Sequence, residues 1–386
     1  MKENQIDRWI FYTVLGLMAF GIIMVYSASA FYADKFRSDH LYYLKRQLLW
    51  VFLGIILILV AYKFPYEKLQ KKTWIFIFIS LLLLMYLNVR RGGRWIPLGF
   101  LNIQVSDIAR LSLIIFLADS LSRKEQYLDS FKEGFIPHLF YILLFAFLIV
   151  IQPDFSSAFM LVLIGLSILF ISPIPVRYFV YSFLLIMPAA ALVIKISAYK
   201  FERIIAFLHP EQDVLGKGYQ ILQSLISLGA GGITGVGFAQ SNQKLFFLPE
   251  AHTDFIYSII GEEWGLLGTI FVLGLFLILM MRGLALTRKA PDKFTRYLAF
   301  GLTANLVFYA LINMMVATHL APPTGLPLPF ISYGGSSMLI SSLCVGLLLN
   351  ISNNVNSTVR TAAFVGMERS ALHRKLRSLG INTSER

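Results

Sequence analysis

The stretch LPEAHTDFIYSIIGEEW, residues 248–264, changes from a polar loop to an apolar run at Asp254. Apolar runs of this kind recur along the 386-residue chain, of which 57% is hydrophobic and 14% charged. A carboxylate at the edge of such a run belongs at a membrane surface, because burying it would cost roughly 2.5 to 3.5 kcal/mol on insertion scales. Together with the mean hydropathy of +0.69, the pattern predicts a polytopic membrane protein.

About ten apolar runs are long enough to cross a hydrocarbon layer of roughly 30 Å as helices. We therefore expect one all-α integral membrane domain over residues 1–386. No cleavable signal peptide is indicated, because the run after Arg8 lacks a small-residue cleavage pattern and is long enough to be the first span. The predicted spans are 9–29, 47–63, 73–88, 107–122, 137–152, 155–172, 177–195, 254–281, 296–318 and 331–351.

The distribution of Lys and Arg predicts that both termini are cytoplasmic. In that orientation the inner segments hold about 21 of the 34 basic residues, as the positive-inside rule requires. The net charge of +13 is then explained by membrane orientation, and nucleic-acid binding is not expected. The basic tail, about 358–386, is expected to lie on anionic lipid or to meet cytoplasmic partners. Cys344, the single cysteine, is expected to be a buried structural thiol.

The longest segment between spans, about 197–253, is predicted to lie outside, between the seventh and eighth helices. Residues 219–228 have helical spacing, and such a helix could lie along the membrane interface. Five glycines follow between Gly229 and Gly237, which permits tight turns close to a ligand or to another helix. A glycine cluster alone is weak evidence for phosphate binding, and no nucleotide-binding pattern accompanies it.

The most unusual segments all face outward in this orientation. They include 90–95, 152–154, the long loop and the proline-rich segment 322–337. Prolines at 322, 323, 327 and 329 break any helix there. Irregular backbone at membrane depth is tolerated only where protein or water covers it. We therefore expect this proline loop to line a cavity at the outer face.

These segments resemble the SEDS family of FtsW, RodA and SpoVE. The motifs that carry the resemblance are VYSAS (25–29), KRQ (45–47), RWIPLG (94–99), QPDF (152–155), GKGYQILQSLISLGAGGITGVG (216–237), LPEAHTDFIYSIIGEEWGLLG (248–268) and LPLPFISYGGSS (326–337). The resemblance covers essentially the whole chain. It implies a ten-helix fold in the bacterial cytoplasmic membrane and a peptidoglycan glycosyltransferase. Such an enzyme polymerises lipid II at the extracytoplasmic face.

Within the family, the loop before Leu248 lacks the insertion usual in the elongation (RodA-like) branch, which favours the division (FtsW-like) branch. Two local departures stand out. The family's frequent QPSE-x-x-K appears here as Gln104 to Asp107 followed by Arg110, and residues 313–320 differ from the usual glycine-rich approach to the proline loop. These departures concern local shape and leave the implied reaction unchanged.

Sugar polymerisation needs a base that takes the proton of the acceptor hydroxyl. The family's essential aspartate carries over to Asp254 through the LPEAHTD motif, so Asp254 is the predicted general base. The departing pyrophosphate needs cations or helix N-terminal amides. The predicted substrate-binding residues are Arg46, Arg94, Arg203, Lys217, Lys244, Glu250, His252, Ser332 and Ser336, with Arg46 and Arg203 first among the cations. No cofactor or protein metal site is evident, although a divalent cation at the pyrophosphate remains open.

Each acidic residue also has a structural interpretation. Asp254 could instead cap the eighth span, with Thr253 as its competitor. Glu250 could simply pair with Lys244, and His252 could be an interfacial hydrogen-bonding residue. A structural network is predicted for Asp107, Arg110, Asp154, Glu262 and Glu263. In it, Asp107 pairs with Arg110, Asp154 caps the sixth span, and Arg110 is also a possible partner of the two glutamates.

Two other classes of function, a flippase and a scaffold, account for only some of these features. A lipid II flippase would suit ten helices with intramembrane acids, but the chain has no obvious inverted repeat, and its polar motifs gather at the outer face rather than the midplane. A scaffold would leave the Asp254 cluster unexplained. The partners implied by the resemblance are lipid II and the growing glycan strand, a class B penicillin-binding protein that crosslinks it, other divisome or elongasome membrane proteins, and membrane lipid.

Overall fold

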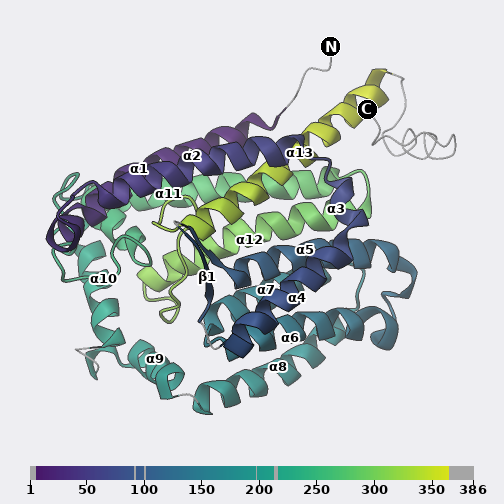
Figure 1. The fold of residues 1–386 in the computed structure, drawn as a ribbon, viewed down its shortest axis with the longest axis horizontal. Helices are drawn as coiled ribbons and strands as arrows, with labels where there is room; N and C mark the ends of the chain where they lie inside the picture. Colours follow the sequence, from purple (N-terminus) through teal and green to yellow (C-terminus); the bar gives the residue numbers. More distant parts are fainter. Residues whose placement is uncertain (1–5, 91–92, 100, 197, 213–215, 365–386) are drawn as a thin grey trace.

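The computed structural model describes residues 6–364 except 91–92, 100, 197 and 213–215, and these residues form a bundle of helices (Figure 1). Seven helices of this described chain are long and apolar enough to cross a membrane. They are α1 (Arg8–Arg37), α2 (Tyr42–Lys63), α4 (Thr73–Arg90), α6 (Ile136–Ile151) with the π-helical turn η2 (Phe131–Phe135) before it, α11 (Ile256–Lys289), α12 (Lys293–Ala317) and α13 (Gly335–Phe364). Two further apolar helices are α7 (Phe155–Phe170) and α8 (Val176–Ile196), of which residues 176–189 form the apolar part.

Helix α5 (Val105–Arg123) is the least apolar member of the bundle and one of its most deeply buried. It packs against α4, α7 and α12, and three of its four charged residues, Asp107, Arg110 and Asp119, are buried. Charges at membrane depth are tolerated where they face protein and pair with one another. Each predicted apolar run overlaps α5 or one of the apolar helices, while the number of membrane crossings stays a prediction.

Short elements connect the helices. They are α3 (Glu67–Lys71), η1 (Glu125–Tyr127), α9 (Ala198–Leu208), η3 (Pro210–Gln212) and α10 (Lys217–Gly231), with one antiparallel hairpin of β1 (Trp95–Leu98) and β2 (Leu101–Gln104). The sequence did not predict the hairpin. The predicted helix at 219–228 is confirmed as α10, while its position at the membrane interface stays a prediction. Ser224 Oγ of α10 lies 2.6 Å from Ser258 Oγ and donates to Ala317 O at 2.7 Å, so α10 packs on α11 and α12.

The start of α1 and the end of α13 lie at the same end of the bundle (Figure 1). This agrees with the prediction that both termini face one side of the membrane. We call the opposite end, where α1 passes into α2, the outer end. Cys344 is buried in α13, as expected. Most of the predicted basic tail, 365–386, lies outside the described residues.

Helix α11 is interrupted at Gly265, whose φ of 64° and ψ of −159° are not helical. The glycine-rich loop after α10 fills the interruption. Val236 N donates to Glu262 O at 2.9 Å and Gly237 N to Glu263 O at 3.1 Å, while Leu266 N donates to Gly232 O at 2.9 Å. Backbone groups in a membrane must find partners within the protein, and this loop supplies them to the broken helix.

The glycines of this loop permit the close approach. A Cβ added at Gly235 would lie 2.1 Å from Glu263 O, and one at Gly231 would lie 1.9 Å from Gly261 O. Neither position has room for any side chain. The sequence left open whether the glycine cluster approaches a ligand or another helix. The structure shows that it approaches another helix, α11.

We expect Gly265→Ala to destabilise the protein by more than about 1 kcal/mol, because alanine is strained at positive φ. Its Cβ would also lie 2.4 Å from Gly235 N. Gly274→Ala is the matched control, since it lies in the same helix with no atom within 4 Å of the added Cβ. Thermal unfolding in detergent should show a lower melting temperature for the first variant alone. Equal melting temperatures would contradict the packing described here.

Candidate functional site

A cavity of about 1040 Å³ opens at the outer end of the bundle. Ligand sites commonly occupy about 300 to 1,000 Å³, so this one is large. It is lined by α2, the β1–β2 hairpin, α5, the α6–α7 turn, the loop before α11, α12, the proline loop and the start of α13. Its charged lining residues are Arg46, Arg94, Asp107, Asp154, Glu250 and Asp254. The prediction that the proline loop lines a cavity is confirmed, because residues 324–327 and 333–337 line it.

Asp254 lies half-buried in the cavity wall, just before α11 begins at Ile256. The N-cap residue of α11 is Phe255, which makes no side-chain cap, whereas Asp254 and Thr253 precede it. The Asn313 amide donates to Asp254 O and to Leu326 O, both at 2.8 Å, which ties this loop to the proline loop. No sequence pattern indicated this role for Asn313.

The Asp254 carboxylate faces the proline loop. A Cβ added at Gly325 would lie 3.4 Å from Asp254 Oδ2, and Gly325 has a φ of 72°. A residue without a side chain at this position leaves the carboxylate open to the cavity. Ser332 fixes the residue before Asp254, because its hydroxyl donates to Thr253 O at 2.5 Å. Ser332 is not among the cavity-lining residues, so its contact with substrate stays a prediction.

Two predicted cations reach the cavity. Arg46 is an exposed side chain of α2, and its guanidinium carbon lies 4.7 Å from the Tyr42 ring centroid. Arg94 precedes the β1–β2 hairpin and approaches Asp154 at 3.7 Å. Asp154 accepts from Ser157 N at 3.2 Å, which confirms that it caps α7, the sixth predicted span. A capping carboxylate thus also positions a cation at the cavity.

The floor of the cavity is a buried polar group around Asp107. Its carboxylate accepts from Arg110 Nη2 at 2.9 Å and from Ser336 Oγ at 2.7 Å. The guanidinium of Arg110 also contacts the Tyr309 hydroxyl and lies 4.1 Å from the centroid of that ring. The predicted pairing of Asp107 with Arg110 is confirmed. Tyr309, a lining residue, was not predicted, because one tyrosine in an apolar run carries no distinguishing signal.

His252 does not line the cavity. Its buried ring lies among three tyrosines, 4.6 Å from Tyr43, 5.6 Å from Tyr32 and 5.9 Å from Tyr333 between centroids. Burial lowers the pKa of His252 below its ordinary value, so the imidazole is neutral at pH 7. This ring therefore supports the loop, and the predicted direct contact with substrate is corrected.

The predicted roles of Lys244 also differ from what the structure shows. Its ammonium donates to Glu263 Oε1 at 2.8 Å and to Ser27 Oγ at 3.1 Å, and only 9% of its side chain is exposed. The predicted pair with Glu250 is wrong, and Lys244 is not available to substrate. Glu250 instead accepts from the Thr253 hydroxyl at 2.9 Å and lines the cavity. The side chains of Arg203 in α9 and Lys217 in α10 lie outside what the structure describes, so their role stays a prediction.

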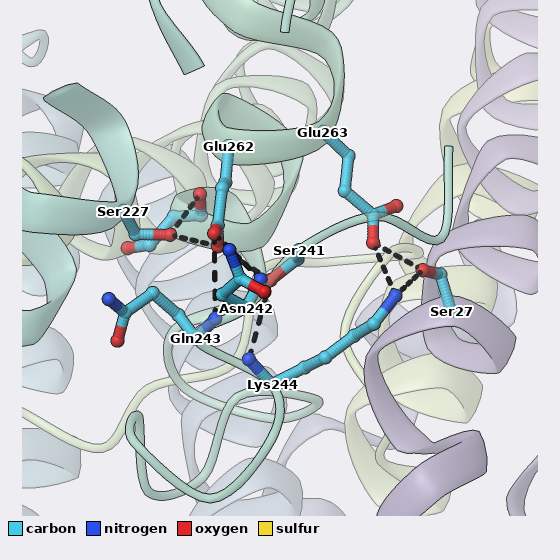
Figure 2. Close-up of polar contacts among 9 residues, drawn as sticks. Ser27, Ser227, Ser241, Asn242, Gln243, Lys244, Glu262 and Glu263 are labelled. Carbon is cyan, nitrogen blue, oxygen red and sulfur yellow. Dashed lines mark hydrogen bonds and ion pairs between the residues drawn. The ribbon is translucent and has the colours of Figure 1, made fainter. Parts of the chain in front are cut away.

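Two glutamates next to the break in α11 organise the segment that leads to Asp254 (Figure 2). Glu262 accepts from Ser227 Oγ at 3.0 Å, Ser241 Oγ at 2.5 Å and Asn242 N at 2.9 Å. Glu263 accepts from Ser27 Oγ at 2.6 Å and from Lys244. The predicted structural network is confirmed here, but neither glutamate pairs with Arg110.

Within the described residues, no group of three or more His, Cys, Asp or Glu side chains is arranged to hold a metal ion. The polar residues that line the cavity with Asp254 are two arginines, three further carboxylates and several hydroxyl side chains. Such a site can bind an anion and accept a proton in one enclosed space.

Comparison with known proteins gives consistent matches over most of the chain. The family profile of FtsW, RodA and SpoVE, described as "Cell cycle protein", matches residues 7–357. A "Probable peptidoglycan glycosyltransferase FtsW" of Trichlorobacter lovleyi is 40% identical over 90% of this chain and 93% of the relative. "Stage V sporulation protein E" of Bacillus subtilis is 38% identical over 91% of this chain and 98% of the relative.

Solved structures agree with this fold. One chain, from work described as "Structural coordination of polymerization and crosslinking by a peptidoglycan synthase complex", has a TM-score of 0.74 at 27% identity and covers 90% of this chain and 97% of its own length. The rod shape determining protein RodA of Thermus thermophilus has a TM-score of 0.66 at 25% identity, with 91% of this chain and 98% of the other covered.

We expect Lys244→Met to destabilise the protein by about 3 to 5 kcal/mol, because Glu263 would remain buried without its cation. Adding Glu263→Gln should restore much of the loss. Lys293→Met is the matched control, since Lys293 and Glu125 form a pair at 3.0 Å with 45% and 48% of their side chains exposed. Such exposed pairs contribute at most about 1 kcal/mol. Thermal unfolding in detergent measures all three, and similar losses for Lys244→Met and Lys293→Met would disprove the buried pair.

Proposed function

This chain belongs to the FtsW, RodA and SpoVE family and is a peptidoglycan glycosyltransferase of the membrane, and on that premise we propose that it polymerises lipid II in the outer cavity with Asp254 as general base. The observation that carries the proposal is the placement of Asp254. Its carboxylate faces a large cavity that also contains Arg46 and Arg94. A proton acceptor and cations for an anionic leaving group thus share one space.

The reaction places specific demands on these residues. The acceptor's 4-hydroxyl attacks the anomeric carbon of the donor, forming the new C–O bond while the bond to the pyrophosphate oxygen breaks. The proton of the hydroxyl passes to the Asp254 carboxylate, and the pyrophosphate leaves with the bonding electrons. Arg46 and Arg94 lie where they can offset its charge. No nucleotide is needed, because the lipid pyrophosphate already activates the donor.

The rigidity of the Asp254 loop supports the same assignment. General bases act within hydrogen-bond reach of the proton that they take, so small displacements matter. Asn313, Ser332 and the Glu262 network fix the backbone on both sides of Asp254. A carrier that moved substrate across the membrane would need its polar site near the midplane, between moving halves. The charged cavity instead lies at one end of the bundle.

We further propose a role in septal wall synthesis with a class B penicillin-binding protein as crosslinking partner. The relatives named FtsW support the first point. The structural relative from a synthase complex that coordinates polymerization and crosslinking supports the second. Polymerisation and crosslinking are expected to occur close together, because newly made strands need crosslinking where they emerge.

We expect Asp254→Asn and Asp254→Ala to lower lipid II polymerisation about 100-fold or more, because general-base catalysis is lost. Asp34→Asn is the control, as Asp34 is an exposed outer carboxylate that does not line the cavity. Glycan length and yield from purified protein, with and without the transpeptidase, provide the measurement. Undiminished polymer from both Asp254 variants would refute the proposed base.

We expect the gene to restore septation to cells depleted of their division polymerase, and not to restore rod shape to cells depleted of their elongation polymerase. Microscopy of the two depleted strains, with the Asp254→Asn gene as the negative control, distinguishes the branches. Recovery of rod shape alone would assign the protein to elongation.

A further inference from the structure

A connected group of aromatic rings lies at the outer end, beside the cavity. We call it the aromatic surface, and it consists of Phe31, Tyr32, Phe36, Tyr43 and Phe246. The Phe246 ring lies 5.3 Å from Phe31, 6.0 Å from Tyr32 and 5.7 Å from Phe36 between centroids, and Tyr43 lies 6.1 Å from Tyr32. Despite these contacts, Phe31, Phe36 and Phe246 remain 47%, 57% and 37% exposed.

The aromatic surface continues into the cavity wall. The Tyr43 ring meets the edge of Tyr333 at 5.0 Å between centroids, and Tyr333 lines the cavity. Arg46, one helical turn after Tyr43 in α2, lines it as well. A long ligand that leaves the cavity past Tyr333 would therefore meet these rings next.

Contact with lipid chains does not explain the exposed ring of Phe36 on α1. The helix has 30 residues and is thus about 45 Å long, whereas the hydrocarbon layer is about 30 Å thick. With the first span ending near residue 29, Phe36 lies roughly 10 Å beyond the hydrocarbon. The same turns carry the exposed charges of Asp34, Lys35 and Arg37, which suits water and headgroups better than lipid chains.

The loop residue Phe246 is held against α1 in a costly conformation. Its φ of 72° lies in the left-handed region, which bulky residues rarely adopt. Strain of this kind persists where surrounding structure enforces it, and it is concentrated at functional sites. Lys35 Nζ lies 4.3 Å from the centroid of the same ring. The result is an exposed aromatic group with a cation over one of its rings.

Aromatic faces and cations together suit a peptide-bearing glycan. The negative face of a ring attracts the weakly positive C–H groups on one side of a sugar, and Lys35 and Arg46 suit the carboxylates of the attached peptides. A strand of many sugars is longer than the cavity and must leave it over the surface. No further pocket is needed for this contact, because each sugar can lie flat on a ring.

We propose that the aromatic surface binds the growing glycan strand as it leaves the cavity. The inference rests on the proposed polymerase function and deepens it. A strand held outside keeps its reactive end at high effective concentration near Asp254 between additions. The aromatic surface thereby sets strand length, whereas the cavity sets the rate of each bond formed.

Strand binding is tested with the full chain in lipid nanodiscs carrying Asp254→Asn, so that turnover does not interfere. The probe is soluble, lipid-free, uncrosslinked peptidoglycan strands. We expect Phe36→Ala with Phe246→Ala to weaken binding about tenfold, the combined effect of two exposed rings. The matched control is Trp9→Ala with Tyr12→Ala, which removes two aromatic side chains that are 63% and 64% exposed at the other end of α1. The control should bind strands like the parent.

Polymerisation by otherwise unmodified protein gives the second readout. The Phe36→Ala, Phe246→Ala protein should consume lipid II at the parent's initial rate but make shorter strands, and the control should match the parent. Unchanged affinity and strand length would overturn the inference. So would unchanged strand binding with a loss of stimulation by the transpeptidase, because the surface would then belong to that partner. Polymer made by Asp254→Asn protein would instead defeat the proposed base and leave the strand-binding result standing.

Discussion

Helix α11 leaves helical geometry at Gly265 inside a hydrophobic bundle, and the backbone groups freed there need partners that lipid cannot supply. The loop after α10 provides them by pairing with Glu262, Glu263 and Leu266. Because that loop must come within bonding distance of another backbone, its sequence is limited to glycine at Gly231 and Gly235. The requirement for satisfied hydrogen bonds thus limits the composition of the segment that fills the interruption.

The two glutamate carboxylates beside the interruption also need partners, because they carry charge in a buried place. Glu262 and Glu263 are buried, and each is compensated by groups from distant parts of the chain. Ser27 of α1 and Lys244 of the long loop both meet at Glu263 (Figure 2). The loop is therefore fixed to two helices only a few residues before Glu250 and Asp254. Compensation of buried charge, which stability requires, also positions the cavity's acidic residues.

The cavity shows a complementary arrangement, in which carboxylates line an open space and are oriented by their neighbours. Asp154 caps α7 and approaches Arg94, while Asp107 is committed to Arg110 and Ser336. These contacts occupy the carboxylates at the hairpin and at the floor. The backbone of Asp254 is tied down by Asn313, and its carboxylate lies toward the small residue Gly325 at the cavity wall. A fixed backbone with a carboxylate facing the cavity is the arrangement expected of a general base.

The sequence by itself determined the membrane class, the apolar runs and the gathering of polar and proline-rich segments at one face. These features follow from transfer free energies that add along the chain and depend little on neighbours in space. It also singled out Asp254, through a resemblance carried by short motifs. Partners close in sequence were also predictable, because residues three apart on a helix are neighbours on its surface. Asp107 and Arg110 form such a pair.

Only the tertiary structure decided which distant groups meet. Lys244 lies six residues from Glu250 and 19 from Glu263, yet it pairs with the latter, because the break at Gly265 brings the loop against α11. The β1–β2 hairpin, the roles of Asn313 and Tyr309, and the aromatic surface that joins α1 to Phe246 were likewise absent from any sequence pattern. Each depends on packing between segments far apart in the chain, and hydrophobic periodicity contains no information about which of several polar partners lies within reach.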